Sequence, residues 1–535
     1  MEEFDYLIVG AGSAGCVLAD RLSASGRHSV LVLEAGGSDR RPWIRIPIGY
    51  GRTFHDERVN WKFRTEPDGG TGGRTSYWPR GKVVGGSSSI NALVYCRGLP
   101  PDFDDWRDAG ALGWGWSDVE PYFRRSERNV RGKVETGDGP LCVADMRDAM
   151  HPLSRHYFAA AEAMGLTRTE DFNGPSPEGV GYYRINVRNG FRCSAADAFL
   201  RPALRRRNCA LRIQATVQKI LFEEGRAAAI EYRTGDRTLR VRARREIILS
   251  AGTVCSPKLL QASGIGPGAL LQEFGIEVVA DAPAVGAQLQ DHLAVSYYFR
   301  ASEPTLNDLL HPLSGRAKAA LRYALNRSGP LSLSVNQCGG LVRSSPDKAR
   351  PDLQLYFNPF TYSTDDGGRR PLNKPHAYSG FLLCFQPCRP TSRGRVALRS
   401  PDPDDPPRIE PNYLSTENDV ADIVAGGKFL QRMLLTEAMR GLVAEAVPPR
   451  LDAMSDEAIV ADFRERCGTV YHPVGTCRMG SDPATSALDP ALRIRGVSGL
   501  RVIDASVFPN ITSANTNAPT LMVAQKGADL VLADA

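Results

Sequence analysis

Hydrophobic residues at the start of the chain fall into short continuous runs with a helical stretch between them. Residues 6–9 and 29–33 are runs of strand length, and the apolar positions of residues 16–25 recur with helical spacing. Continuous apolar runs are typical of parallel strands in a sheet covered on both faces, so the pattern predicts a β-α-β unit. A third run, residues 246–252, ends in small residues. Ligands bind at this carboxyl edge of an open α/β sheet.

The second half of the chain follows a different pattern. Apolar and polar residues alternate over 352–357 and 394–399, as in half-exposed antiparallel strands. Residues 417–435 have helical periodicity, and the proline-rich run 400–407 separates the elements. These features predict a separate domain with an antiparallel sheet and helices. Two domains also fit the length of 535 residues, because single hydrophobic cores stop growing at about 250–300 residues.

Composition and charge exclude some classes of function. The chain is 42% hydrophobic and 24% charged, which is ordinary for a globular protein. No run approaches the length of about 18 apolar residues that a membrane helix needs. Residues 1–5 are acidic, so we expect no secretory signal. The net charge is +6, but the densest basic cluster, residues 201–207, lacks interleaved aromatic residues, and we expect no nucleic-acid partner.

The 11 cysteines are odd in number and scattered, which does not match a disulfide framework. None has CxxC spacing and no His completes a zinc set beside them, so we expect no metal site. Free thiols suit a reducing compartment. We therefore expect a cytoplasmic protein, and leave open a peripheral contact with the inner face of a membrane.

A glycine-rich turn follows the first predicted strand and opens the helix. Gly10 permits a tight turn, Gly12 lets the backbone approach a pyrophosphate, and Gly15 lets the helix pack on the strand. The phosphates would lie at the positive N-terminus of the helix. Glu34 ends the second strand, where a carboxylate accepts hydrogen bonds from an adenosine ribose. The combination predicts a dinucleotide site but does not separate NAD from FAD.

Longer motifs make that choice. Residues 79–92 are rich in glycine and serine, and residues 252–266 form a second long pattern that ends in glycine turns. Further motifs follow at residues 470–479 and 514–520. In these motifs and their order the chain resembles the glucose-methanol-choline (GMC) oxidoreductase family, from residue 4 to about residue 530. It is most similar to the alcohol- and choline-dehydrogenase branch.

The resemblance implies an α/β fold, α+β overall. It consists of a Rossmann-like FAD-binding domain and a discontinuous substrate-binding domain built on an antiparallel sheet covered by helices. We expect the FAD-binding domain to comprise residues 1–155, 195–296 and 465–535. The substrate-binding domain would then comprise residues 156–194 and 297–464.

The resemblance also implies which residues hold FAD. Val84 and residues 91–94 would lie against the isoalloxazine, and Val217 near the adenine, while residues 504–505 and 516–517 would complete the flavin site. The expected cofactor set is Gly10, Gly12, Ser13, Ala14, Gly15, Glu34, Ala35, Trp61, Val84, Gly86, Ser87, Asn91, Ala92, Leu93, Val94, Val217, Ala251, Gly252, Tyr471, Asp504, Ala505, Thr516 and Asn517.

Two positions depart from the family pattern. Some relatives attach FAD covalently through a histidine, but this chain has Ile90 there, so we expect non-covalent FAD. Gln288 stands where the family usually has Asn. We interpret this change as loop variation, with a weakened structural hydrogen bond as the alternative.

Residues 470–479 resemble the catalytic-histidine segment of the family, and Asn515 stands where relatives carry His or Asn. Removing a hydride from an alcohol carbon builds positive charge there, so a base must take the hydroxyl proton. His472 suits this role because an imidazole has a pKa near neutrality. Asn515 can donate a hydrogen bond to the developing alkoxide, and flavin N5 receives the hydride. His292 lies in a family-like segment, and we interpret it as structural.

The predicted function is FAD-dependent oxidation of a primary alcohol to an aldehyde, with electrons passed to a quinone or another acceptor. An alcohol oxidase using O2 is the alternative, because oxygen access beside the flavin is not readable here. Non-redox relatives, such as hydroxynitrile lyases, are a further reading. The pair His472 and Asn515 argues against a flavin-binding redox partner without catalysis. His472 also argues against light-driven fatty-acid decarboxylation, because that branch lacks the histidine.

The substrate pocket should be lined from the second domain. We expect Tyr356, Phe357 and Phe385 to contribute, with Val470 near the flavin. Aromatic and apolar walls favour an apolar or aromatic primary alcohol over a quaternary ammonium compound or a sugar. The alternative is that these aromatic residues belong to the hydrophobic core.

Overall fold

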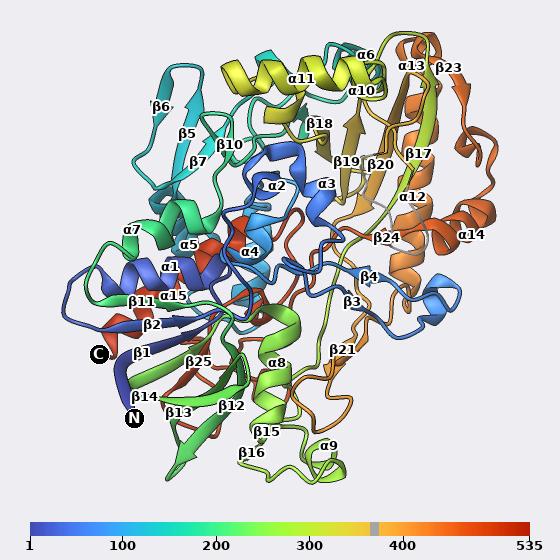
Figure 1. The fold of residues 1–535 in the computed structure, drawn as a ribbon. Coiled ribbons are helices and arrows are strands. Elements are labelled where there is room, and N and C mark those ends of the chain that lie inside the picture. Colours follow the sequence, from blue (N-terminus) through green and yellow to red (C-terminus); the bar gives the residue numbers. More distant parts are fainter. Residues whose placement is uncertain (364–373) are drawn as a thin grey trace.

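The computed structural model describes residues 1–363 and 374–535, and two seven-stranded sheets organise it (Figure 1). The first sheet lies at the lower left of Figure 1, near both chain ends, and has the strand order β11-β2-β1-β14-β13-β12, with β25 beside β14. Its strands are β1 (Glu2–Val9), β2 (Val30–Leu33), β11 (Cys209–Arg212), β12 (Thr216–Glu223), β13 (Arg226–Thr234), β14 (Arg237–Leu249) and β25 (Leu500–Val502).

Parallel pairing in the centre of the first sheet confirms the β-α-β prediction. β1 lies between β2 and β14 and is parallel to both, and β11 continues the parallel set beyond β2. The central runs are buried, and neither Leu7 nor Leu31 has exposed surface. α1 (Ser13–Ser23) and α15 (Asn517–Ala533) pack together against these strands. α1 begins at Ser13, not at residue 16, because the glycine-rich turn leads directly into its first turn.

The second sheet, at the upper right of Figure 1, has the order β23-β17-β20-β19-β18-β8, with β24 beside β17. Every one of these pairings is antiparallel, as predicted. Helices cover one face of this sheet and share a hydrophobic core with it. The strands are β8 (Gly179–Tyr182), β17 (Leu293–Ala301), β18 (Cys338–Val342), β19 (Leu353–Asn358), β20 (Gly380–Pro387), β23 (Val443–Ala446) and β24 (Gly468–Thr469), and the helices are α6 (Ser154–Ala163), α12 (Glu417–Leu434), α13 (Glu437–Leu442) and α14 (Asp456–Arg466).

Three details differ from the sequence predictions. β19 is buried over its whole length and is not half exposed, because helices cover one face and the loops of the first unit cover the other. β21 (Arg395–Ala397) does not join the second sheet but pairs with β22 (Arg408–Glu410) in a separate ribbon. β17 runs as one strand across the expected domain boundary at residue 296.

Two glycines let α12 approach the second sheet closely. A Cβ on Gly426 would lie 2.3 Å from the ring of Phe385 in β20, and a Cβ on Gly427 would lie 2.6 Å from Ile459 in α14. Because real Cβ atoms do not make such short contacts, larger residues here would force the helix away from its neighbours. The predicted helix over residues 417–435 is therefore confirmed, and its inner face is fitted to the sheet.

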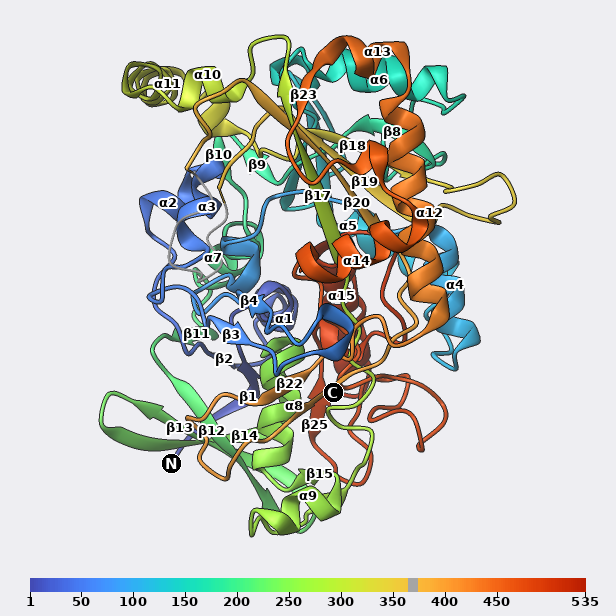
Figure 2. The ribbon, with the colours of Figure 1, turned by 90° about the vertical axis from the view of Figure 1, so that its right-hand side faces the viewer.

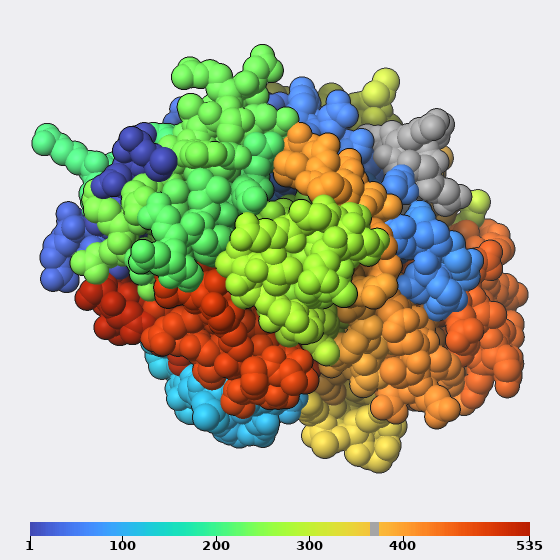
Figure 3. All heavy atoms as spheres, turned by 90° about the horizontal axis from the view of Figure 1, so that it is seen from below, coloured from blue at the N-terminus to red at the C-terminus, as the bar shows by residue number. Residues whose placement is uncertain are grey.

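The first unit is assembled from distant parts of the chain. Seen from below in Figure 3, the blue N-terminal residues, the green β11–β14 region and the red C-terminal segment lie side by side. No helix among the described residues is both long and apolar enough to cross a membrane. Other described helices are α2 (Pro42–Arg45), α3 (Tyr50–Thr53), α4 (Pro100–Asp108), α5 (Trp116–Ser126), α7 (Arg201–Ala203), α8 (Gly252–Ala262), α9 (Gly268–Glu273), α10 (Leu306–Leu310) and α11 (Leu313–Asn326), and the short turns include η1 (Pro47–Gly49), η3 (Gly86–Ser89), η6 (Pro330–Ser332) and η8 (Ala505–Val507). Small ribbons are formed by β3 (Phe63–Arg64), β4 (Tyr77–Trp78), β5 (Glu127–Arg131), β6 (Val134–Thr136), β7 (Leu141–Ala144), β9 (Val187–Arg188), β10 (Phe191–Arg192), β15 (Ile265–Gly266) and β16 (Ala280–Asp281).

Candidate active site

The glycine-rich turn joins β1 to α1 at the carboxyl edge of the first sheet. Gly10 has a φ of +98°, which L side chains rarely adopt. A Cβ on Gly15 would lie 1.9 Å from the carbonyl oxygen of Gly10, so only glycine allows this approach. Ser13 and Ala14 begin α1, which has no side-chain cap and no acidic residue in its first turn. Its first N–H groups are therefore available to an anion.

Glu34 lies beside this turn at the end of β2, followed by Ala35. Its Oε2 accepts a hydrogen bond from the Ala11 N–H at 2.9 Å, and its Oε1 accepts one from the Gly36 N–H at 2.8 Å. Burial raises the pKa of Glu34 to about 7, although both N–H donors act to lower it. Each carboxyl oxygen keeps a further lone pair for a hydroxyl group. Ala215 donates its N–H to the Glu34 carbonyl, which places Val217, two residues on, at the same edge.

The loop that carries Val84, Gly86 and Ser87 packs directly over the glycine-rich turn. The N–H of Gly85 donates to the Ala11 carbonyl at 2.7 Å. A Cβ on Gly86 would lie 2.6 Å from the Cα of Gly12, so both loops approach each other as bare backbone.

The C-terminal segment reaches the same place through α15. Ser13 Oγ donates to Asn517 Oδ1 at 2.8 Å, so the N-termini of α1 and α15 meet. Thr516 is the N-cap of α15 and makes no side-chain cap hydrogen bond. Two uncapped helix N-termini and a glycine-lined backbone cleft suit the phosphates and carbonyl oxygens of FAD. The residues present therefore fit this cofactor.

A buried arginine, which the sequence did not identify, holds the next part of the expected cofactor site. Arg192 is 2% exposed and donates to the backbone carbonyl and to Oδ1 of Asn91, at 2.8 and 2.7 Å. It also donates to the carbonyl oxygens of Ile44 and Ser88. Burial lowers the pKa of Arg192 to about 9. The residues that follow Asn91, namely Ala92, Leu93 and Val94, are fixed by this anchor, and Leu93 has a φ of +72°.

Two expected cofactor segments are tied together by one carboxylate. Asp504 accepts hydrogen bonds from the Gly252 N–H at 2.8 Å and from Ser256 Oγ at 2.6 Å. This links Ala251 and Gly252, at the start of α8, to Ala505 in η8. Trp61 lies apart from the glycine-rich turn. Its ring stacks on Phe63 and packs against the core of the second sheet.

His472 follows β24 on a loop in which Tyr471 has a φ of +69°. It is 7% exposed, and its backbone N–H donates to Asp291 Oδ1 at 2.9 Å. His472 Nε2 lies 3.1 Å from Asn515 Nδ2, and His472 Nδ1 lies 3.0 Å from His292 Nδ1. The structure thus brings the two expected catalytic side chains together and adds a third, His292.

The hydrogen-bond chain behind His472 determines its tautomer. His292 Nε2 lies 2.8 Å from the carbonyl oxygen of Cys388, which can only accept, so Nε2 carries the proton. Burial lowers the pKa of His292 to about 4, so the ring is neutral and its Nδ1 is an acceptor. His472 must then donate through its own Nδ1. The lone pair of His472 consequently lies on Nε2, facing Asn515. Burial, followed by His292 and the Arg80 guanidinium, holds the pKa of His472 well below its usual value of 6.5.

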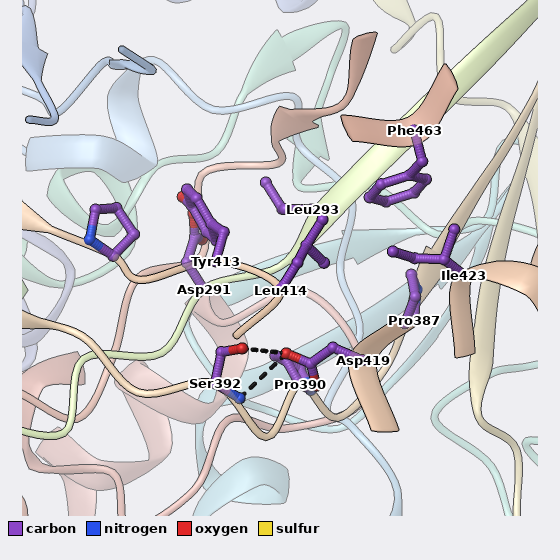
Figure 4. Close-up of a pocket in the computed structure, with 11 residues that line it drawn as sticks. Asp291, Leu293, Pro387, Pro390, Ser392, Tyr413, Leu414, Asp419, Ile423 and Phe463 are labelled. Atoms are coloured by element: carbon purple, nitrogen blue, oxygen red, sulfur yellow. Dashed lines mark hydrogen bonds between the residues drawn. The ribbon is translucent and has the colours of Figure 1, made fainter. Parts of the chain in front are cut away.

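Asp291 and Arg80 support this loop. Besides the His472 N–H, Asp291 accepts a hydrogen bond from the Tyr413 hydroxyl at 2.6 Å, and burial raises its pKa to about 6. Arg80 donates to the carbonyl oxygen of Tyr471. Figure 4 shows Asp291 and Tyr413 at one end of a cavity whose other end is lined by Phe463. Neither His472 nor Asn515 lines this cavity, so we do not assign it to the reaction.

The expected substrate residues divide between the two faces of the second sheet. Tyr356 lies on the face toward Asn515, whose side chain hydrogen-bonds its hydroxyl, and Val470 packs in the same cluster. Phe357 and Phe385 lie on the other face. Phe357 stacks on Tyr157 of α6, 5.3 Å between ring centroids. Phe385 lies under α12. Neither belongs beside Tyr356, because successive strand residues point to opposite faces.

Gln354, two residues before Tyr356, shares its face and was also missed. Its Nε2 lies 3.4 Å from Asn515 Oδ1, which turns the amide nitrogen of Asn515 toward His472. The alternation of β19 itself would have paired Gln354 with Tyr356. For His292 the signal was its place in the Gln-Asp-His run. Gln288, in the same segment, has a φ of +61°, a conformation that Asn adopts more readily than Gln. The Asn-to-Gln departure therefore falls on a left-handed backbone position.

Comparisons with known proteins agree with this geometry. Two family models, both described as GMC oxidoreductase, match residues 4–294 and residues 390–524. An alcohol dehydrogenase (acceptor) from Pseudomonas putida is 41% identical over 535 residues, which covers 99% of this chain and 96% of the relative. The mitochondrial choline dehydrogenase of Homo sapiens is 40% identical over 542 residues, covering 99% and 90%. The crystal structure of pyridoxine 4-oxidase from Mesorbium loti superposes with a TM-score of 0.86 at 30% identity, covering 98% of both chains.

Proposed function

This chain belongs to the GMC oxidoreductase family, which acts on CH–OH donors with FAD, and we propose that it oxidises a primary alcohol to an aldehyde. The observation that carries the proposal is the pairing of His472 Nε2 with Asn515 Nδ2 at 3.1 Å. One atom is a proton acceptor and the other a donor, and an alcohol oxygen between them would meet both. A cofactor-binding protein without catalysis needs neither group.

In this proposal His472 is the base. Its Nε2 takes the hydroxyl proton as positive charge develops on the alcohol carbon. Asn515 donates from Nδ2 to the oxygen that gains negative charge, and such a donor is worth about 10²–10³ in rate. His292 keeps the other ring nitrogen of His472 protonated, so that the lone pair stays on Nε2. FAD, when bound, supplies the acceptor for the hydride.

We propose that FAD is held non-covalently. The residues that would hold it are the glycine-rich turn, Glu34 and the N-terminus of α15. Ile90, at the position of covalent attachment in some relatives, offers no nucleophile and packs in a small apolar cluster with Ile44 and Val83.

The division into a FAD-binding and a substrate-binding domain is also part of the proposal. The expected boundary at residue 296 would cut β17, so we move it to the beginning of that strand at Leu293. The other expected boundaries cut none of the described strands of either sheet.

The substrate is proposed to be an apolar or aromatic primary alcohol. The face that presents Tyr356 to Asn515 also carries Ala294, Leu382 and Cys384, with Val470 beside them. This cluster of described residues contains no carboxylate to pair with a quaternary ammonium group. Two of the relatives are named for alcohol and choline, and the cluster favours the former. We propose a quinone or similar acceptor, with O2 as the alternative, and action in the cytoplasm or at the inner face of a membrane.

The test is anaerobic stopped-flow reduction of the purified flavoprotein by aliphatic, benzylic and furanic alcohols and choline. We expect one alcohol class to bleach the flavin band, and His472→Gln to slow bleaching by about 10²–10⁴. His311→Gln, at an exposed histidine, is the matched control and should change nothing. Rapid return of colour in air would identify an oxidase. A flavin that stays oxidised with every alcohol would overturn the dehydrogenase proposal and favour a lyase.

A further inference from the structure

α11 (Leu313–Asn326) lies on the outside of the molecule with almost all of its surface in solvent. Among its residues only Gly315, Ala319 and Tyr323 are buried, and they recur every four positions on one face. The opposite face is not polar. Leu313, Leu321 and Leu325 are 80, 61 and 71% exposed, which is unusual for large apolar side chains in three consecutive turns. A helix that only covered a core would place these leucines on its buried face.

The exposed leucines form one stripe. Leu313, Ala317, Leu321 and Leu325 follow one another at intervals of four residues, and the exposed Ala320 and Ala324 widen the stripe. In Figure 2 α11 is seen nearly end-on at the upper left edge of the molecule, with no other element outside it.

Basic residues border the stripe on both sides. By helical spacing Lys318 and Arg322 lie along one border and Arg316 and Arg327 along the other. In the part of the chain that the structure describes, Arg316 and Arg322 donate to neutral oxygens, those of Leu310 and Ser328. The sequence from residue 309 to residue 346 contains no Asp or Glu. The surface therefore combines an apolar centre with a purely cationic rim.

The inner face holds this helix firmly. A Cβ on Gly315 would lie 2.0 Å from the carbonyl oxygen of Leu309, so the helix begins in close contact with α10. The Tyr323 hydroxyl donates to the carbonyl oxygen of Gly190 at 2.9 Å. The leucines are therefore presented on a fixed support.

We propose that the outer face of α11 docks the protein on the surface of an anionic membrane. An apolar stripe between rows of Arg and Lys is the pattern of a helix that lies in the lipid interface: the leucines enter the acyl boundary and the cations meet the phosphate groups. A second copy of the chain fits less well. A two-fold contact would bring these cations against each other with no acidic residue on the helix to pair with them.

A second feature points the same way. α2 and α3 lie on the same side of the molecule as α11, at the left of Figure 2. Trp43 in α2 is 40% exposed, and the guanidinium of Arg52 lies 4.3 Å from its ring centroid. η6 contacts both α11 and η1, the turn after α2. Tryptophan prefers the membrane interface, where its ring is apolar and its N–H is hydrated.

Vesicle flotation of the FAD-loaded protein tests the proposal. We expect it to float with vesicles of phosphatidylcholine and phosphatidylglycerol, and not with phosphatidylcholine alone. The double variant Leu321→Glu/Leu325→Glu should lower the bound fraction at least tenfold. Leu435→Glu, at a leucine 60% exposed on another surface, is the matched control and should float like the wild type. Arg316→Gln and Lys318→Gln should each weaken binding about fivefold.

Wild-type protein that does not float with anionic vesicles would overturn the proposal. Equal flotation of the double variant and the wild type would also overturn it, because the stripe would then play no part. Sedimentation velocity without lipid gives the remaining outcome. If the wild type is a dimer that Leu321→Glu dissociates, the occupant of this face is a second copy of the chain and not a membrane.

Discussion

His472 donates a hydrogen bond from Nδ1 to Nδ1 of His292, 3.0 Å away, and His292 in turn donates from Nε2 to the carbonyl oxygen of Cys388. A backbone carbonyl cannot change its role, so the direction of the whole chain follows from it. The proton-accepting atom of His472 is thereby placed next to Asn515, although the residue that determines this is 180 positions away in the sequence.

Replacing His292 should therefore impair His472 without removing it. In His292→Leu, His472 loses the partner that sets its tautomer and ring orientation, and we expect flavin reduction to slow by about 10- to 100-fold. His292→Gln keeps an acceptor toward His472 and a donor toward Cys388, and should recover part of the rate. Stopped-flow reduction at saturating alcohol measures both, with FAD content as the check on folding. An unchanged rate in His292→Leu would mean that His472 keeps its tautomer unaided.

The pH dependence should follow the low pKa of His472. Burial, His292 and Arg80 all favour its neutral form. A base acts only when neutral, so the rate of flavin reduction should stay constant from pH 8 down to 6.5 and fall only in more acidic solution. Arg80→Met removes a nearby positive charge, so the pKa of His472 should rise and the acidic limb should move to higher pH. Arg80→Lys keeps the charge and should leave the limb in place.

Asn515 should act through the charge of its donor. Asn515→Ala removes the hydrogen bond to the developing alkoxide, and we expect the reduction rate to fall by about 10²–10³. Asn515→Asp puts a carboxylate in the same place, where it repels that charge, and should be slower than Asn515→Ala. Single-turnover kinetics with the two variants compares them directly. The opposite order would show that shape, not charge, is what the site requires of Asn515.

Glu34 should matter for FAD binding and not for the proton transfer. Glu34→Gln replaces one acceptor oxygen by an NH2 group that faces the N–H of Ala11 or Gly36. A buried donor left without an acceptor costs about 1–3 kcal/mol, so we expect the Kd for FAD to rise by about 10- to 100-fold. Quenching of flavin fluorescence during reconstitution measures this. Once saturated with FAD, the variant should be reduced by alcohol at the wild-type rate.

The close packing of α12 should not tolerate a methyl group. Gly426→Ala would bring a Cβ to 2.3 Å from the Phe385 ring, and we expect a loss of about 1–3 kcal/mol in the free energy of unfolding. Gly441→Ala in α13 is the control, since nothing lies within 4 Å of its Cβ position. It should stabilise the helix by about 0.5–1 kcal/mol. Chemical denaturation of the two variants, side by side, tests the difference.

Local signals were enough to predict several parts of this protein. The β-α-β unit and the phosphate-binding turn depend on residues close in sequence, because hydrophobic period and glycine conformation are short-range properties. The helix at Glu417–Leu434 followed from its periodicity in the same way. His472 and Asn515 were found because each lies in a recognisable motif. By contrast, the sequence grouped Tyr356, Phe357 and Phe385 as one pocket lining, whereas the structure separates them.

The reason is that period two in a strand shows which residues share a face but not what each face meets. Helices α6 and α12 cover the face of Phe357 and Phe385, and the loops of the first unit cover the face of Tyr356 and Gln354. The same limit applies to Arg192, which binds Asn91 from 101 residues away, and to His292. The sequence by itself determined the local elements, the cofactor turn and the reactive side chains. Only the tertiary structure decided their partners, because hydrogen bonds between distant segments depend on how the two sheets and their loops pack.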